Sequence, residues 1–121
     1  MGHKILVIDD SQSFRQQVSM TLEMKGHKCT TAEDGLDGIE VLQREKDFEL
    51  IICDVNMPRL DGLSTIERIK NEKLFEGPIV MLTTEGDRKL IDRGKELGVD
   101  CWMVKPFDPE ALSKVVSKLT A

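Results

Sequence analysis

Side chains suited to phosphoryl chemistry follow four short apolar runs of this 121-residue chain. The runs cover residues 5–8, 50–53, 79–82 and 101–104, and they are followed by Asp9 and Asp10, by Asp54, by Thr83 and by Lys105. Short apolar runs between polar residues are typical of buried parallel strands. Because ligands of open α/β sheets bind beyond the carboxyl ends of the strands, we expect these side chains to converge at one edge of a sheet.

Three carboxylates in one place repel one another unless a cation joins them. Mg²⁺ suits such a site, because it binds few protein oxygens and keeps waters and phosphate as its other ligands. Asp9 and Asp10 lie at a turn from strand to helix, where both can serve the metal, one of them through water. Asp54 ends a different strand, so its carboxylate is free to react.

A carboxylate such as Asp54 can attack phosphorus and form an acyl phosphate. Phosphoryl transfer requires little from a protein beyond positioning and charge neutralisation. Lys105 can reach one phosphoryl oxygen as a flexible point charge, and the Thr83 hydroxyl can donate to another. Each residue alone also fits an ordinary structural role, as a cap, a strand-end hydroxyl or a surface cation. Their joint position at four strand ends favours the phosphoryl site.

Three helix starts are predicted from capping residues. The first helix should begin near Asp10 or Ser11, and the second should follow Asp34. The last should begin at Asp108, because Pro109 then takes the first helical position.

Apolar stripes predict two further helices, over residues 63–69 and 90–97, and a weak strand is predicted over residues 28–32. Five strands and five helices in strict alternation indicate an α/β fold with a doubly wound parallel sheet, covered on both faces. The order of the strands does not follow from this pattern. Residues 1–121 contain no linker or repeat and are expected to form one domain.

The composition is ordinary for a globular protein, with 40% hydrophobic and 32% charged residues. The apolar runs are far too short to span a bilayer, and residues 1–4 show no secretory signal. We therefore expect a cytoplasmic protein without membrane insertion. The formal net charge of −5 argues against nucleic acid as a partner, because phosphate backbones attract clustered Lys and Arg.

The three cysteines show no C-x-x-C spacing, and all lie in strand-like runs. Cys29, Cys53 and Cys101 are therefore predicted to be reduced, buried thiols. His3 and His27 lack the paired spacing of a zinc site.

Five segments of the chain together resemble the receiver domain of two-component response regulators. They read ILVIDDS at residues 5–11, DVNMP at 54–58, LDG at 60–62, LTT at 82–84 and VKPF at 104–107. The resemblance covers essentially the whole chain. It implies the flavodoxin-like strand order 2-1-3-4-5 and a cis peptide bond between Lys105 and Pro106.

The resemblance also implies roles for single residues. Asp54 would accept a phosphoryl group from a phosphohistidine on a sensor histidine kinase. Asp10, Asp54 and the backbone carbonyl of Asn56 would hold Mg²⁺, with Asp9 assisting through water. Thr83 and an aromatic residue on the fifth strand, here Trp102, would form the switch.

Two positions depart from the usual receiver pattern. Trp102 is bulkier than the Tyr or Phe that many receivers carry there, and its only donor is the indole N–H. Thr84 stands beside the expected phosphate, where many receivers have Ala or Gly, so we expect it to affect access to Asp54.

Within the family, the single-domain build and the segment from Trp102 to Pro109 look most like chemotaxis proteins of the CheY type. That likeness implies a CheA-like kinase and, as target, the flagellar motor switch. The output face would be formed by the fourth helix, the fifth strand and the fifth helix. Its candidate apolar residues are Ile91, Trp102, Val104 and Phe107.

Other functions remain open from the sequence. A stand-alone phosphorelay or phosphate-sink receiver outside chemotaxis would carry the same motifs. A small aspartate-nucleophile phosphatase would resemble D-x-D at the nucleophile, whereas this chain has Asp54-Val55-Asn56. Flavodoxin is disfavoured because Asp9 and Asp10 would repel a flavin phosphate. We therefore expect no enzyme apart from self-directed phosphoryl transfer and autodephosphorylation.

Overall fold

The structure is a computed structural model that describes residues 2–121. The strands are β1 Lys4–Ile8, β2 Lys28–Ala32, β3 Leu50–Cys53, β4 Ile79–Thr83 and β5 Cys101–Val104. The helices are α1 Gln12–Glu23, α2 Gly35–Arg44, α3 Gly62–Asn71, α4 Arg88–Glu96 and α5 Pro109–Leu119. The expected domain of residues 1–121 also includes Met1, which lies outside the described residues. Within residues 2–121, no helix is long and apolar enough to cross a membrane.

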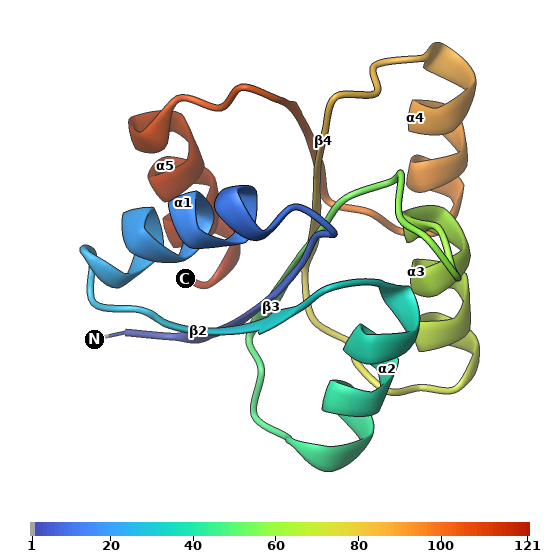
Figure 1. Cartoon of the computed structure of the whole chain (residues 1–121), viewed down its shortest axis with the longest axis horizontal. Helices are drawn as coiled ribbons and strands as arrows, with labels where there is room; N and C mark the ends of the chain where they lie inside the picture. Colours follow the sequence, from blue (N-terminus) through green and yellow to red (C-terminus); the bar gives the residue numbers. More distant parts are fainter. Residues whose placement is uncertain (1) are drawn as a thin grey trace.

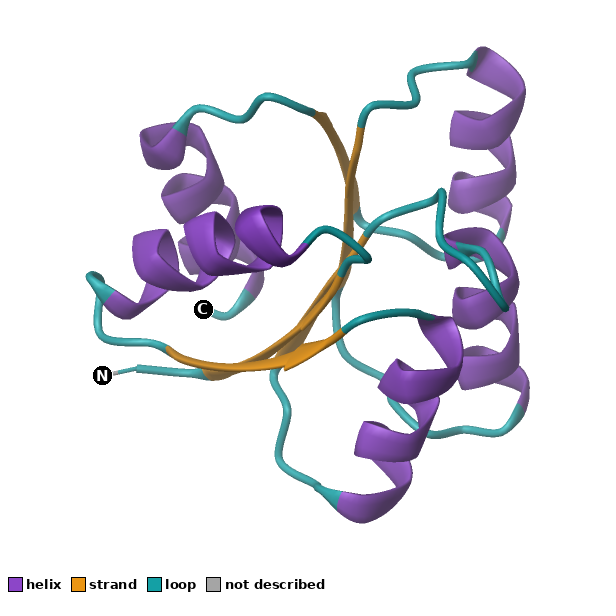
Figure 2. Ribbon diagram, viewed as in Figure 1, coloured by secondary structure: helices purple, strands orange, loops and turns teal. Residues whose placement is uncertain are grey.

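The strands form one parallel sheet in the order β2-β1-β3-β4-β5, which confirms the order implied by the receiver resemblance. Figure 1 shows α1 and α5 on one face of this sheet and α2, α3 and α4 on the other. Figure 2 shows the twisted sheet between the two helical layers. The predicted doubly wound α/β fold is therefore confirmed.

Alternate residues of β1 face the two cores. Ile5 and Val7 lie in the cluster that contains the buried residues of α1 and α5. Leu6 and Ile8 lie in the cluster that contains those of α2 and α3. β1 is buried on both sides, which is why its sequence is apolar without alternation.

The register of the strands brings the polar side chains together. The last residues of β1 and β3 pair, so Asp9 and Asp54 leave neighbouring strands at the same level. The last residues of β4 and β5 also pair, and the backbone N–H of Lys105 donates to the Thr83 carbonyl at 2.8 Å. The four strand ends therefore form one edge, as the sequence predicts.

The predicted helix starts are present. Ser11, Asp34 and Asp108 cap α1, α2 and α5, and each side chain accepts a hydrogen bond from a backbone N–H of the first turn. α1 ends at Glu23, and the turn after it closes at Gly26, whose φ of 92° suits glycine.

The burial predicted for the outer strands is wrong. β5 was expected to be buried, yet its residues are only partly covered and Val104 is 50% exposed. Cys29 in β2 and Cys101 in β5 are half-buried, whereas Cys53 in β3 is buried as expected. β2 and β5 are the edges of the sheet, so each has a neighbouring strand on one side only. All three cysteines are free.

Candidate functional site

Three carboxylates meet at the carboxyl edge of the sheet. Asp9, Asp10 and Asp54 each offer an oxygen that lies within 4.8 Å of the others. Asp9 and Asp54 are only 3% and 6% exposed, whereas Asp10 faces solvent. This is the predicted acidic cluster, and Asp10 forms its open side.

Backbone hydrogen bonds orient the two buried carboxylates. Asp9 Oδ1 accepts from the N–H of Ser11 at 2.9 Å, and Asp54 Oδ1 accepts from the N–H of Val55 at 2.7 Å. Each acid thus has one oxygen fixed by its own turn. The Oδ2 atom of each is directed to Lys105.

Lys105 lies between the two buried acids. Its Nζ is 2.8 Å from Asp9 Oδ2 and 3.2 Å from Asp54 Oδ2. It also lies 4.0 Å from the centroid of the Phe14 ring, a cation–π contact. The peptide bond from Lys105 to Pro106 is cis, which confirms the prediction. One cation therefore faces two carboxylates in a largely buried site.

The charges in this cluster are not balanced. Burial, together with the negative charge of Asp54, raises the pKa of Asp9, although hydrogen bonds from Lys105 and Ser11 oppose the shift. Burial alone would lower the pKa of Lys105, but the hydrogen bond and charge of Asp9 and the charge of Asp54 outweigh it and raise that pKa. Compared with free side chains, the ammonium form of Lys105 is favoured and the carboxylate form of Asp9 is disfavoured. A further cation would relieve this imbalance.

The donors present fit Mg²⁺. Carboxylate oxygens from Asp9, Asp10 and Asp54 are hard ligands of the kind this ion binds. Asn56 lies two residues after Asp54 and is exposed, and its backbone carbonyl would be the fourth predicted donor. The exposure of Asp10 and Asn56 leaves room for the waters that Mg²⁺ retains.

Glu85 connects Asn56, beside the acidic cluster, to the switch residues Thr83 and Trp102. We predicted no role for Glu85 from the sequence. Its carboxylate accepts from Asn56 Nδ2 at 2.6 Å. Its backbone N–H donates to Thr83 Oγ1 at 3.3 Å, and its carbonyl accepts from Trp102 Nε1 at 2.7 Å. Its position two residues after Thr83 was the only signal in the sequence. One residue of the β4–α4 loop thus contacts Asn56, Thr83 and Trp102.

The bulk of Trp102 is accommodated by α4. Its ring packs over Gly94, where a Cβ atom would lie 3.0 Å from the ring. Trp102 is half-buried and joins the core cluster beneath α2, α3 and α4. A glycine in the last turn of α4 weakens the helix, but here it makes space for the indole.

The loops around the site are held by two further contacts that the sequence did not predict. Gly62 begins α3 so close to β3 that a Cβ would overlap the Asp54 carbonyl oxygen. Arg59, in the same loop, binds buried Asp34 through two hydrogen bonds of 2.7 and 2.9 Å. These contacts fix the segment that follows Asp54. Thr84 is exposed.

Comparison with known proteins identifies the family. Residues 5–117 match the family model described as the response regulator receiver domain. The chemotaxis protein CheY homolog of Campylobacter jejuni is 36% identical over 113 residues, which cover 92% of this chain and 87% of that protein. The alkaline phosphatase synthesis transcriptional regulatory protein PhoP of Bacillus subtilis is 36% identical over 119 residues, 98% of this chain but 49% of PhoP.

Among solved structures, the chemotaxis protein CheY4 of Vibrio cholerae is similar throughout. The TM-score is 0.90 at 38% sequence identity, and the similarity covers 98% of this chain and 99% of CheY4. This agrees with the strand order of the sheet. The chain therefore belongs to the response regulator receiver domain family and is CheY-like.

Proposed function

We propose that residues 1–121 form a receiver domain that accepts a phosphoryl group on Asp54 from a histidine kinase, with Mg²⁺ as cofactor. The carrying observation is the position of buried Asp54, which shares one site with Asp9, Asp10 and Lys105. Receiver domains are signalling proteins, so the only chemistry would be this transfer and the later hydrolysis of the acyl phosphate, in which water takes the phosphoryl group as inorganic phosphate and restores the Asp54 carboxylate. Steady turnover of unrelated phosphate esters is not expected.

In the proposed transfer, a carboxylate oxygen of Asp54 attacks the phosphorus of the phosphohistidine. The new P–O bond forms as the P–N bond breaks, and the imidazole leaves with the bonding electrons. Mg²⁺, when bound to the acidic cluster, would neutralise charge on the phosphoryl oxygens. The N–H of Val55 holds the carboxylate in place, and Lys105 moves its ammonium toward a phosphoryl oxygen.

The proposed switch begins at Thr83. Its side chain is fully buried, and its hydroxyl oxygen now accepts from Glu85 N–H. A phosphoryl oxygen on Asp54 would accept a hydrogen bond from the Thr83 hydroxyl and draw the side chain inward. Because Glu85 also accepts from the indole of Trp102, movement of this loop changes the surroundings of Trp102.

The proposed output face consists of α4, β5 and α5. Val104 is exposed, and Ile91 and Trp102 are half-exposed, which leaves apolar surface on this face. Phe107 instead packs edge-on against Phe14 of α1, at 5.5 Å between ring centroids. By likeness to its CheY relatives, the kinase would be CheA-like and the target the flagellar motor switch, in the cytoplasm and without a nucleic acid partner.

This proposal is tested with purified kinases from the same organism. A CheA-like kinase, labelled on its histidine, should transfer its phosphoryl group to this chain faster than other histidine kinases do. The beryllofluoride-bound chain should then bind motor-switch protein more tightly than the unmodified chain. If a different kinase transferred its phosphoryl group to this chain and the CheA-like kinase did not, the chemotaxis assignment would be contradicted.

A receiver in a relay outside chemotaxis is the second candidate. It is supported by the match to PhoP, which is as identical to this chain as the CheY homolog is. The same panel of kinases separates the two candidates, because both predict phosphorylation of Asp54 but by different donors.

A further inference from the structure

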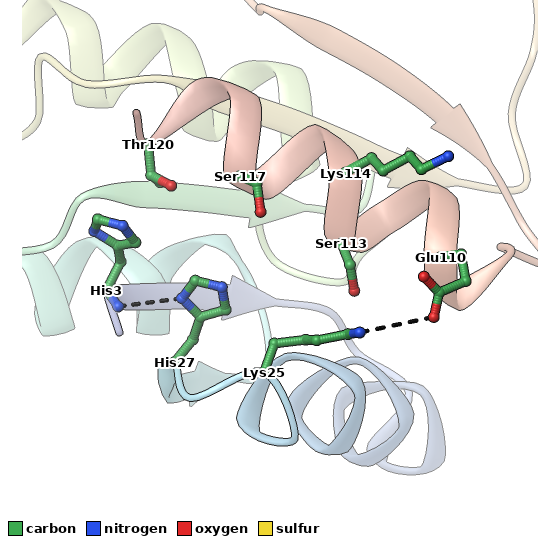
Figure 3. Close-up of a pocket in the computed structure, with 8 residues that line it drawn as sticks. All are labelled: His3, Lys25, His27, Glu110, Ser113, Lys114, Ser117 and Thr120. Atoms are coloured by element: carbon green, nitrogen blue, oxygen red, sulfur yellow. Dashed lines mark hydrogen bonds and ion pairs between the residues drawn. The ribbon is translucent and has the colours of Figure 1, made fainter. Parts of the chain in front are cut away.

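A second polar pocket lies at the end of the sheet opposite Asp54. It is formed by residues before β1 and β2, by the end of α1 and by α5, and its volume is about 520 Å³. Pockets of this size hold small organic molecules. Figure 3 shows side chains from these segments facing one another across it.

One wall of the pocket is a row of hydroxyls on α5. Ser113, Ser117 and Thr120 are spaced so that they share one face of the helix, and Figure 3 shows the oxygens of Ser113 and Ser117 directed into the pocket. Thr120 already donates to a backbone carbonyl at 2.7 Å. The two serine hydroxyls can rotate and either donate or accept. This wall suits a ligand that carries hydroxyl groups.

The opposite wall presents an imidazole N–H. The backbone N–H of His3 donates to Nδ1 of His27 at 3.1 Å, and the two rings stack 5.5 Å apart. Burial and the neighbouring His3 lower the pKa of His27, so its ring is neutral at neutral pH. A neutral ring that accepts at Nδ1 carries its proton on Nε2. That N–H lies on the side of the ring away from His3 (Figure 3).

A cation completes the set of donors. Lys25 Nζ lies 3.8 Å from Glu110 Oε1, and both side chains are exposed. Such a pair is weakly held, so an incoming anion can displace Glu110 from Lys25. Lys114 lies at the rim with its ammonium turned away from the pocket (Figure 3). Two lysines and one glutamate thus line this pocket in a chain whose net charge is −5.

We propose that this pocket binds a small phosphomonoester with a hydroxylated body. The phosphate group contacts Lys25 and the Nε2–H of His27, and the hydroxylated body lies along Ser113 and Ser117. This site is separate from the phosphorylation site and does not depend on the function proposed above.

The test uses the histidines as reporters. The chain has two histidines, and both line this pocket, so their imidazole NMR signals do not report on Asp54. Glucose 6-phosphate and inorganic phosphate are titrated without Mg²⁺ into Asp54→Asn protein, with sodium chloride at matched ionic strength as control. We expect saturable shifts of both imidazoles with glucose 6-phosphate, and weaker binding of inorganic phosphate.

Two variants should change the affinity in opposite directions. Lys25→Gln should weaken binding about fivefold, because it removes one exposed ionic contact, and Glu110→Gln should strengthen binding, because it removes the competing carboxylate. The proposed site would be overturned if the imidazole shifts failed to saturate or if sodium chloride reproduced them. It would also be overturned if neither variant changed the affinity. Equal affinity for inorganic phosphate and glucose 6-phosphate would overturn the role of the hydroxyl wall. Phosphorylation of Asp54 would stand in either case.

Discussion

Lys105 is the residue on which the charge balance of the site depends. Its ammonium contacts Asp9 and Asp54 at the same time, in a place where both acids are almost fully buried. In the proposed transfer, a phosphoryl group on Asp54 would need this ammonium too, so Lys105 would be shared between Asp9 and the phosphate. A metal ion bound at the acidic cluster would offset the charge of Asp9 when Lys105 moves.

The Lys105→Ala variant should be phosphorylated by acetyl phosphate more slowly but not completely blocked. Losing a hydrogen bond from a charged group costs about 1.5–3 kcal/mol, which corresponds to about a 10- to 150-fold slower reaction. Mg²⁺ still neutralises part of the charge. The rate is measured by intact-protein mass spectrometry, with Lys118→Ala on α5 as control. Labelling of Lys105→Ala at the wild-type rate would show that the ammonium has no role in transfer.

Asp34 should stabilise the fold in a pH-dependent manner. The hydrogen bond and charge of Arg59, helped by backbone hydrogen bonds, lower its pKa below the ordinary 3.8. Its contribution is therefore complete above pH 3.8 and is lost as the pH falls through the lower folded-state value. Asp34→Asn should reduce the free energy of unfolding at neutral pH, and the difference from wild type should shrink in acid.

Urea unfolding at a series of pH values measures this difference. The control is Glu72→Gln, which removes the exposed pair between Arg68 and Glu72 on α3 and should change the stability little at any pH. A difference between wild type and Asp34→Asn that is the same in acid as at neutral pH would contradict the assignment.

Among the helices and strands, the sequence predicts the bounds of the strands better than it predicts how deeply each strand is buried. The runs at residues 50–53 and 101–104 have the predicted bounds, because apolar residues between polar ones define a strand locally. The apolar pattern of β5 predicts burial, because only the strand order shows that β5 is an edge. Val104, which the family resemblance placed on the output face, is exposed. The fourth helix looked weak because of Gly94, and its contact with Trp102 explains the glycine.

Trp102 should report the movement of the β4–α4 loop. Beryllofluoride with Mg²⁺, bound at Asp54, should shift the emission and solvent quenching of this tryptophan, the only one in the chain. Carrying a population from 1:99 to 99:1 needs about 5.5 kcal/mol, whereas one hydrogen bond to Thr83 is worth about 1 kcal/mol. The loop with Glu85 must therefore move as well. Thr83→Ala should reduce the change in emission, and Asp54→Asn should abolish it.

Steady-state fluorescence with and without beryllofluoride provides the measurement. If the emission and quenching of Trp102 stay constant while binding at Asp54 is shown independently, the residue only packs against Gly94. The switch would then lie elsewhere on the output face.

Contacts between segments that are distant in the sequence are the part of the whole molecule that the sequence does not predict. The acidic site was predictable, because the residues after parallel strands share one edge. The strand order came from the family resemblance. The links from Glu85 to Asn56 and from Arg59 to Asp34 join loops that no local pattern relates. The pocket beside His3 and His27 likewise forms only when α1, α5 and the strand starts come together.

The proposed phosphorylation of Asp54 can be measured by labelling the protein with acetyl phosphate. Intact-protein mass spectrometry should show one phosphoryl group per wild-type chain when Mg²⁺ is present. Removal of the metal with EDTA should prevent the labelling, because the carboxylates of Asp9 and Asp10 then lack the cation that offsets their charge. Asp54→Asn should remain unlabelled under all conditions. Stoichiometric labelling of Asp54→Asn would show that Asp54 is not the acceptor, and undiminished labelling of the wild type in EDTA would show that the transfer does not need Mg²⁺.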